Sequence, residues 1–170
     1  PNLNDDDWLW GGDLEKIHQT IAFGVRSGNP KAHDTAMPRF GVDKILDEAQ
    51  IRDAANFVRS FSHLDVDQEA AKRGAQIFAD NCAACHGDHG KGNQDMGAAN
   101  LTDAIWLYGS SQEAVMQSIR TGRGGARPAW SERLDPVAVK MLTLYVYSLG
   151  GAQAEAASAS TPAAGADKPK

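Results

Sequence analysis

Cysteines and basic residues are scarce in this 170-residue chain, and it has no long apolar run. Only two cysteines are present, so any thiol chemistry is confined to one short motif. The 17 Lys and Arg against 22 Asp and Glu give a formal net charge of −5, which argues against a nucleic-acid partner. The longest apolar stretch, Val137 to Leu149, contains Lys140 and is shorter than the about 18 residues that a membrane span needs.

The chain does contain enough apolar sequence for a soluble fold. Hydrophobic residues make up 42% and charged residues 23%, and the length allows one ordinary domain or two small ones. It begins at Pro1 without a signal-peptide pattern, so we expect a processed chain or a fragment. Residues 151–170 are rich in Ala, Ser, Pro and Lys and are predicted to form a disordered tail.

The two cysteines form the motif Cys82-Ala83-Ala84-Cys85-His86, which is the attachment signature of c-type haem. Each thiol adds to one haem vinyl group, and His86 supplies the proximal nitrogen to the iron. A thioredoxin-type redox pair would need a surrounding βαβ pattern, and a zinc site would need four ligands. A disulfide across so short a loop would be strained. The motif therefore favours one covalent haem c at Cys82 and Cys85.

Helical periodicity surrounds this motif and predicts an all-α fold. One helix is expected to run through 66–81 into the motif, a second to begin with a capping box at Ser110–Glu113, and a third to begin at Asp135–Pro136. This pattern resembles class I cytochrome c over residues 66–150. The resemblance implies that the first and last helices cross, with Gly74 and Phe78 facing Leu142 and Tyr145, and that 87–109 wraps the haem edge.

An internal repeat links the two ends of the chain. Residues 2–24 match 100–122 at a constant offset of 98, with ten identical positions that include Trp8/Trp106, and the match resumes at Leu46/Leu134. Residues 1–62 are therefore predicted to be a partial cytochrome c-like domain whose first helix and Cys-x-x-Cys-His motif lie before Pro1. A naturally haem-free copy is the alternative that this pattern leaves open.

The paired tryptophan motifs make the resemblance more specific. Asn2–Gly12, with Trp8-Leu9-Trp10-Gly11, and Asn100–Gly109, with Trp106-Leu107-Tyr108-Gly109, resemble the dihaem subunit III of cbb3-type cytochrome oxidases. The resemblance implies a second haem in the full-length protein and an anchor upstream of this chain. It also implies a place on the periplasmic side of the bacterial inner membrane and the other oxidase subunits as partners. A soluble cytochrome as electron donor is a further expectation.

The sixth iron ligand departs from that family's pattern, in which each domain places a methionine before a proline. The first repeat has Met37-Pro38, so Met37 is expected to be the distal ligand of the missing first haem. The second has Arg127-Pro128, and an arginine offers no lone pair to iron. For the haem at His86, the sequence leaves Met96, an open or exogenous ligand, and His89 as alternatives. Trp106, Tyr108, Arg123 and Arg120 are candidates for contact with the haem propionates.

These observations predict an electron-transfer subunit that is not itself catalytic. The haem iron would change between ferric and ferrous states without transformation of a bound substrate by this chain. One alternative is an open-site haem protein that binds a small ligand or reacts with peroxide. Another is the cytochrome c domain of a different redox complex.

Overall fold

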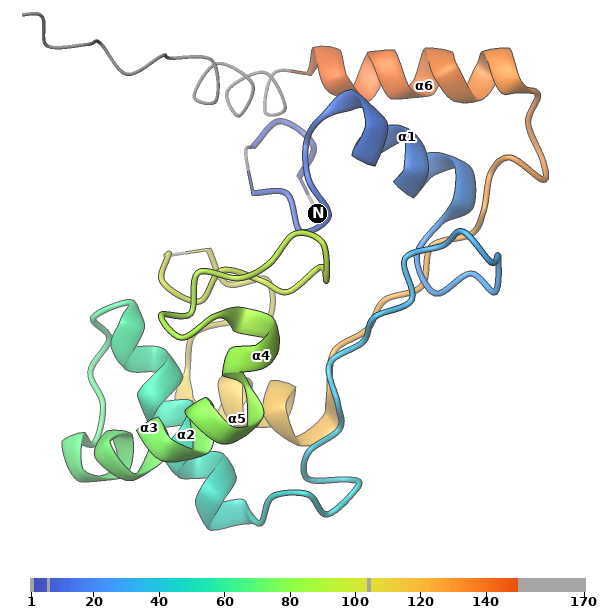
Figure 1. The fold of residues 1–170 in the computed structure, drawn as a ribbon. Coiled ribbons are helices and arrows are strands. Elements are labelled where there is room, and N and C mark those ends of the chain that lie inside the picture. The colour runs from blue at the N-terminus through green and yellow to red at the C-terminus, as the bar shows by residue number, and fades with distance from the viewer. Residues whose placement is uncertain (1, 6, 104, 150–170) are drawn as a thin grey trace, which may run out of the picture.

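The computed structural model describes residues 2–5, 7–103 and 105–149, and every regular element in these ranges is a helix (Figure 1). The expected all-α class is confirmed. The tail predicted over 151–170 lies outside the described residues. The helices are α1 (Leu14–Phe23), α2 (Glu48–Phe61), α3 (Gln68–Asn81), α4 (Ala83–His86), α5 (Gln112–Thr121) and α6 (Pro136–Ser148).

Side-chain caps place the starts of these helices close to where the sequence predicts them. Asp67 accepts hydrogen bonds from the N–H groups of Glu69 and Ala70 at the start of α3. Asp135 caps α6 in the same way, with Pro136 at its first position. At α5 the N-cap is Ser111, which accepts from the Ala114 N–H, so the capping box expected over Ser110–Glu113 does not form: the residue at N3 is Ala114, whose side chain has no acceptor to return the bond.

The internal repeat reappears in the helix bounds. Helix α1 and helix α5 are related by the same offset of 98 that relates their sequences, and α2 begins 88 residues before α6. Each repeat therefore contributes one shorter helix and one longer helix, and only the second repeat also contains α3 and α4.

The longer helices are exchanged between the two repeats. Helix α2 packs against α3 and α5 of the second repeat, and α6 packs against α1 of the first (Figure 1). The expected pairing of Gly74 and Phe78 with α6 is wrong. A Cβ on Gly74 would collide with the backbone of Asp53 in α2, and the Phe78 ring lies 5.3 Å from the Phe57 ring of the same helix. Leu142 and Tyr145 of α6 are instead exposed.

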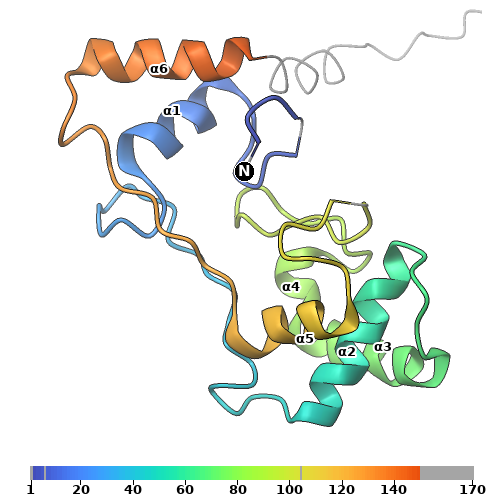
Figure 2. The ribbon, with the colours of Figure 1, turned by 180° about the vertical axis from the view of Figure 1, so that it is seen from behind.

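Two connecting segments cross between the halves of the molecule. The segment after α1 and the segment after α5 run side by side in both views (Figures 1 and 2). Val25 and Arg127 exchange backbone hydrogen bonds of 3.0 and 2.8 Å, and the Arg26 side chain donates to the Gly125 carbonyl. Each segment then continues into the half that contains the other repeat's shorter helix.

This exchange produces two separate hydrophobic cores. The larger core joins the first-repeat residues Phe40, Leu46, Ile51 and Val58 to the second-repeat residues Phe78, Cys82, Val115 and Ile119. The smaller core lies between α1 and α6 and contains Ile17, Ile21, Ala22 and Val139. Apolar side chains of both repeats are buried together in the larger core, so both repeats contribute residues that surround the Cys-x-x-Cys-His motif.

Candidate haem site

A sharp turn between two helices presents the attachment motif. Helix α3 ends at Asn81 and is followed by its C-cap Cys82, whose N–H donates to the Phe78 carbonyl at 2.8 Å, and the short helix α4 begins at Ala83. The His86 N–H donates to the Cys82 carbonyl at 3.0 Å, which closes one helical turn around the motif. Local backbone hydrogen bonding thus holds Cys82, Cys85 and His86 together before any cofactor is considered.

The imidazole of His86 is oriented by a second segment of the chain. Its Nδ1 lies 2.9 Å from the Ala99 carbonyl oxygen, so Nδ1 carries the proton and Nε2 keeps its lone pair. Burial lowers the pKa of His86 and favours the neutral ring. A neutral imidazole oriented by a backbone carbonyl is the form that binds iron.

The two thiols do not have the character of a redox-active pair. Cys82 is buried, and this burial, with a smaller contribution from the neighbouring Cys85, raises the pKa of the Cys82 thiol to about 11. Nucleophilic redox cysteines have the opposite shift, because the thiolate is the reactive form. In the described ranges, no three of the His, Cys, Asp and Glu side chains gather as a metal-binding group.

An apolar cavity of about 290 Å³ opens beside the motif. Its walls include the side chains of Val58, Phe78, Leu101, Val115 and Ile119, from α2, α3, α5 and the loop after α4. Eight of the candidate site residues named from the sequence line this cavity. They are Met37, Cys82, Cys85, His86, Met96, Trp106, Tyr108 and Arg123. Two thiols, one imidazole and two thioethers around apolar walls are a donor set that fits a haem.

The two methionines enter this cavity from different segments. Met96 lies in the loop that also supplies Ala99, and this loop is closed by backbone bonds between Asn93 and Ala98. Met37 comes from the first repeat, on the segment that passes α5, and it packs against the larger core. The sequence did not indicate that Met37 lines the same cavity as His86, because the repeat pattern places Met37 in the first repeat and so next to a different haem.

Arg127 does not lie beside the His86 site, where its place before Pro128 in the sequence predicts it. We expected it next to the haem at His86, in place of a methionine, but Arg127 is absent from the described lining of the cavity. Its backbone pairs with Val25 beside α1, in the other half of the molecule. The exchange of the connecting segments is the physical reason.

The polar side of the cavity contains cations. The Arg123 guanidinium lies 4.2 Å from the centre of the Tyr108 ring and donates to Ser118 Oγ at 3.3 Å. Arg120 is engaged elsewhere, with Glu48, and does not line the cavity, so the suggestion that it could contact a propionate is wrong. Sequence reasoning missed Arg26 as a second lining cation.

Trp10 is another lining residue that the sequence did not identify as part of the site. It packs against Gly97 and stacks on the His33 ring, with centroids 4.2 Å apart. The repeat contained a signal for it, since Trp10 is the partner of Tyr108 at the offset of 98.

A helix that runs into a Cys-x-x-Cys-His turn, next to an apolar cavity in an all-helical fold, defines a c-type cytochrome domain. Comparison with known proteins agrees, because residues 69–146 match the family described as cytochrome C oxidase, cbb3-type, subunit III. The chain is similar to this family over residues 69–146, and the cytochrome c domain there implies haem c as its cofactor.

Individual relatives support the same assignment. The cbb3-type cytochrome c oxidase subunit FixP of Bradyrhizobium diazoefficiens is 57% identical over 153 residues, which are 89% of this chain and 52% of that protein. Subunit CcoP of Cereibacter sphaeroides is 47% identical over 154 residues, which are 90% and 53% of the two chains. The chain thus spans about half the length of the curated relatives it matches. Within the described ranges, no helix has the length and apolar character that crossing a membrane requires.

Proposed function

We propose that this chain binds one haem c and transfers single electrons as part of the electron-delivering subunit of a cbb3-type oxidase. The observation that carries the proposal is the His86 imidazole, fixed by the Ala99 carbonyl at the wall of an apolar cavity that Cys82 and Cys85 also line. Cys82 and Cys85 would hold the haem through thioethers, and His86 Nε2 would bind its iron. The bound haem would supply the one-electron chemistry.

The remaining site residues have roles that follow from their positions in the cavity. Apolar side chains such as Val58 and Phe78 exclude water and so favour the less charged state of a bound redox centre. Arg123 is placed to pair with a haem carboxylate, and Trp106 and Tyr108 can donate hydrogen bonds there.

For the distal iron ligand we propose Met37, in place of the assignment to a different haem. Met96 belongs to the loop whose Ala99 carbonyl orients His86, whereas a second ligand for a haem bound at His86 would be supplied by a separate element. Met37 lies on such an element, beside α5, and lines the same cavity. Its soft thioether sulfur would favour ferrous iron and raise the reduction potential.

At the level of the whole protein we propose a second haem and a membrane anchor in the parts of the relatives that this chain does not span. The chain would then lie on the periplasmic side of the inner membrane, in contact with the other oxidase subunits and with a cytochrome as electron donor. The names of the relatives, as subunits of cbb3-type oxidases, support the contact with the other oxidase subunits.

Mass spectrometry tests the attachment of the cofactor. After expression with the haem-maturation machinery, the denatured chain should have the mass of the polypeptide plus one haem. Cys82→Ala or Cys85→Ala should leave a single thioether bond. A bare polypeptide mass in the unmodified protein would refute the proposed cofactor.

Optical spectra and potentiometry test the ligand. Ferric holoprotein should show the weak far-red band of an iron–thioether bond, and Met37→Ala should remove the band and lower the reduction potential. Met96→Ala and Arg127→Met are the controls and should leave both unchanged. An unmodified protein without this band would favour the open-site alternative, a haem that binds a small ligand or peroxide.

A further inference from the structure

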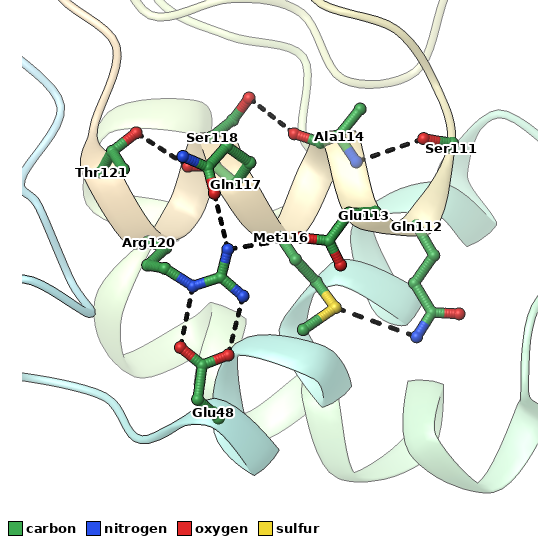
Figure 3. Close-up of polar contacts among 10 residues, drawn as sticks. All are labelled: Glu48, Ser111, Gln112, Glu113, Ala114, Met116, Gln117, Ser118, Arg120 and Thr121. Atoms are coloured by element: carbon green, nitrogen blue, oxygen red, sulfur yellow. Dashed lines mark hydrogen bonds and ion pairs between the residues drawn. The ribbon is translucent and has the colours of Figure 1, made fainter.

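Arg120, in the last turn of α5, holds a first-repeat segment with both its backbone and its side chain. Its carbonyl accepts the N–H groups of Gly41 and Val42, each at 3.1 Å. Its guanidinium donates through Nε and Nη2 to the two carboxylate oxygens of Glu48, each at 2.8 Å (Figure 3). One residue of the second repeat therefore fixes both ends of residues 41–48.

The guanidinium itself is held by its own helix. Its Nη1 donates to the Gln117 side-chain oxygen at 2.6 Å and lies 3.4 Å from Glu113, and these partners surround it in Figure 3. The Arg120 side chain is only 25% exposed. A bidentate pair with a pre-oriented guanidinium costs little side-chain entropy, which distinguishes it from an ordinary surface ion pair.

The segment that Arg120 holds is internally bonded and leads directly to Met37. The N–H of Ile45 donates to the Phe40 carbonyl at 2.8 Å, and the N–H of Asp43 donates to the Arg39 carbonyl at 2.8 Å. At the Met37 end, the chain passes so closely over Gly122 that a Cβ there would collide with the Met37 carbonyl. Residues 37–48 thus lie on α5 as one bonded unit.

The other half of the molecule repeats the backbone geometry without the ion pair. Gly24, the repeat partner of Gly122, packs against the backbone of Arg127 and Pro128, and the Ser131 N–H donates to the Ala22 carbonyl. The positions equivalent to Arg120 and Glu48 are Ala22 and Pro136. The ion pair is therefore present only where the crossing segment contains a methionine.

We infer that Arg120, through Glu48, is a positioning residue for Met37 and keeps its thioether in place over the haem bound at His86. This inference rests on the proposed function, because it requires Met37 to be the distal ligand. A loosened segment would leave Met37 away from the iron for part of the time, and an external ligand would then bind more readily.

Imidazole binding to the ferric holoprotein measures that opening. Arg120→Met should raise the apparent affinity for imidazole about three- to tenfold, because the binding-competent fraction rises, and should weaken the far-red band. Glu48→Gln should have a similar effect, and Arg120→Lys a smaller one, since an ammonium cannot form the bidentate contact. Lys72→Met, which removes the exposed pair with Glu69 on α3, is the matched control and should change neither readout.

A second background separates positioning from general destabilisation. In Met37→Ala holoprotein, Arg120→Met should add nothing to the imidazole affinity. The inference would be overturned if Arg120→Met still raised the imidazole affinity in the Met37→Ala background. It would also be overturned if Arg120→Met lowered the stability of the protein while its far-red band and imidazole affinity stayed unchanged. If Met37→Ala alone changes neither the far-red band nor the imidazole affinity, Met37 is not the ligand, and the inference about Arg120 fails with that proposal. This outcome is known from the Met37→Ala variant alone and is therefore separate from a failure seen only in the Arg120 variants.

Discussion

Phe78 connects the attachment motif to the exchanged helix. It is 2% exposed, and its ring lies 5.3 Å from Phe57 and 5.4 Å from Phe61, both in α2. Phe78→Ala should lower the free energy of unfolding by about 3–5 kcal/mol, because it removes a buried ring and leaves a cavity. Denaturant titration of the holoprotein measures this change.

Leu144→Ala is the control for that substitution. Leu144 is 58% exposed on α6, and a surface change of this kind should alter the free energy of unfolding by no more than about 0.5 kcal/mol. Equal losses in the two variants would contradict the packing described for Phe78.

Glu48 predicts a specific pH dependence of stability. The hydrogen bond from Arg120, more than any other cause, holds the pKa of Glu48 below its ordinary value. A lowered pKa in the folded state means that the carboxylate stabilises the fold above the unfolded pKa, and that this contribution is lost as pH falls through the folded pKa. The difference in unfolding free energy between the parent and Glu48→Gln should therefore be constant above about pH 5 and shrink below about pH 4.

The measurement is a series of denaturant titrations of both proteins across this pH range. If the difference in unfolding free energy between the parent and Glu48→Gln grows as the pH falls, the stabilising role of the Arg120–Glu48 ion pair is contradicted.

Individual site residues were largely predictable from the sequence, for chemical reasons. Cys82, Cys85 and His86 follow from a motif whose spacing is fixed by the cofactor, and Trp106 and Tyr108 follow from the repeat. Arg26 was not predictable, because its place in the cavity wall depends on the crossing of two segments far apart in the chain.

At the scale of elements, the helices were predictable but their partners were not. Asp67, Ser111 and Asp135 mark helix starts by local capping, which needs no tertiary information. The partner of α3 was not predictable, because α2 and α6 have apolar residues at equivalent positions, with Phe57 equivalent to Tyr145 and Val58 to Val146. These shared positions do not determine which of the two helices packs against α3, and long-range packing decides.

A pair of double-mutant cycles tests that choice of partner. The cycle for Phe57 and Phe78 should give a coupling free energy of about 0.5–1.5 kcal/mol, the range for contacting aromatic rings. The cycle for Tyr145 and Phe78 should give about zero, since Tyr145 is 63% exposed on the other half of the molecule. A coupling between Tyr145 and Phe78 would restore the pairing expected from the sequence.

At the scale of the molecule, the exchange brings a methionine of the first repeat to the cavity of the repeat that has Arg127 before its proline. This methionine is Met37, on a segment that crosses from the first repeat and is fastened to α5 at Gly122 and Arg120, and it lines the cavity together with Met96 of the second repeat. The two repeats therefore share one site and would not form it separately.

The most direct test of this shared site is an NMR spectrum of ferrous holoprotein with isotope-labelled methionine methyl groups. A methyl group bound over the haem is shifted far upfield by the ring current of the macrocycle. If Met37 is the iron ligand, one such signal is expected, which Met37→Leu removes and Met96→Leu leaves in place. A signal that persists in Met37→Leu and disappears in Met96→Leu would show that the second repeat ligates its own haem and that the two repeats do not share the site.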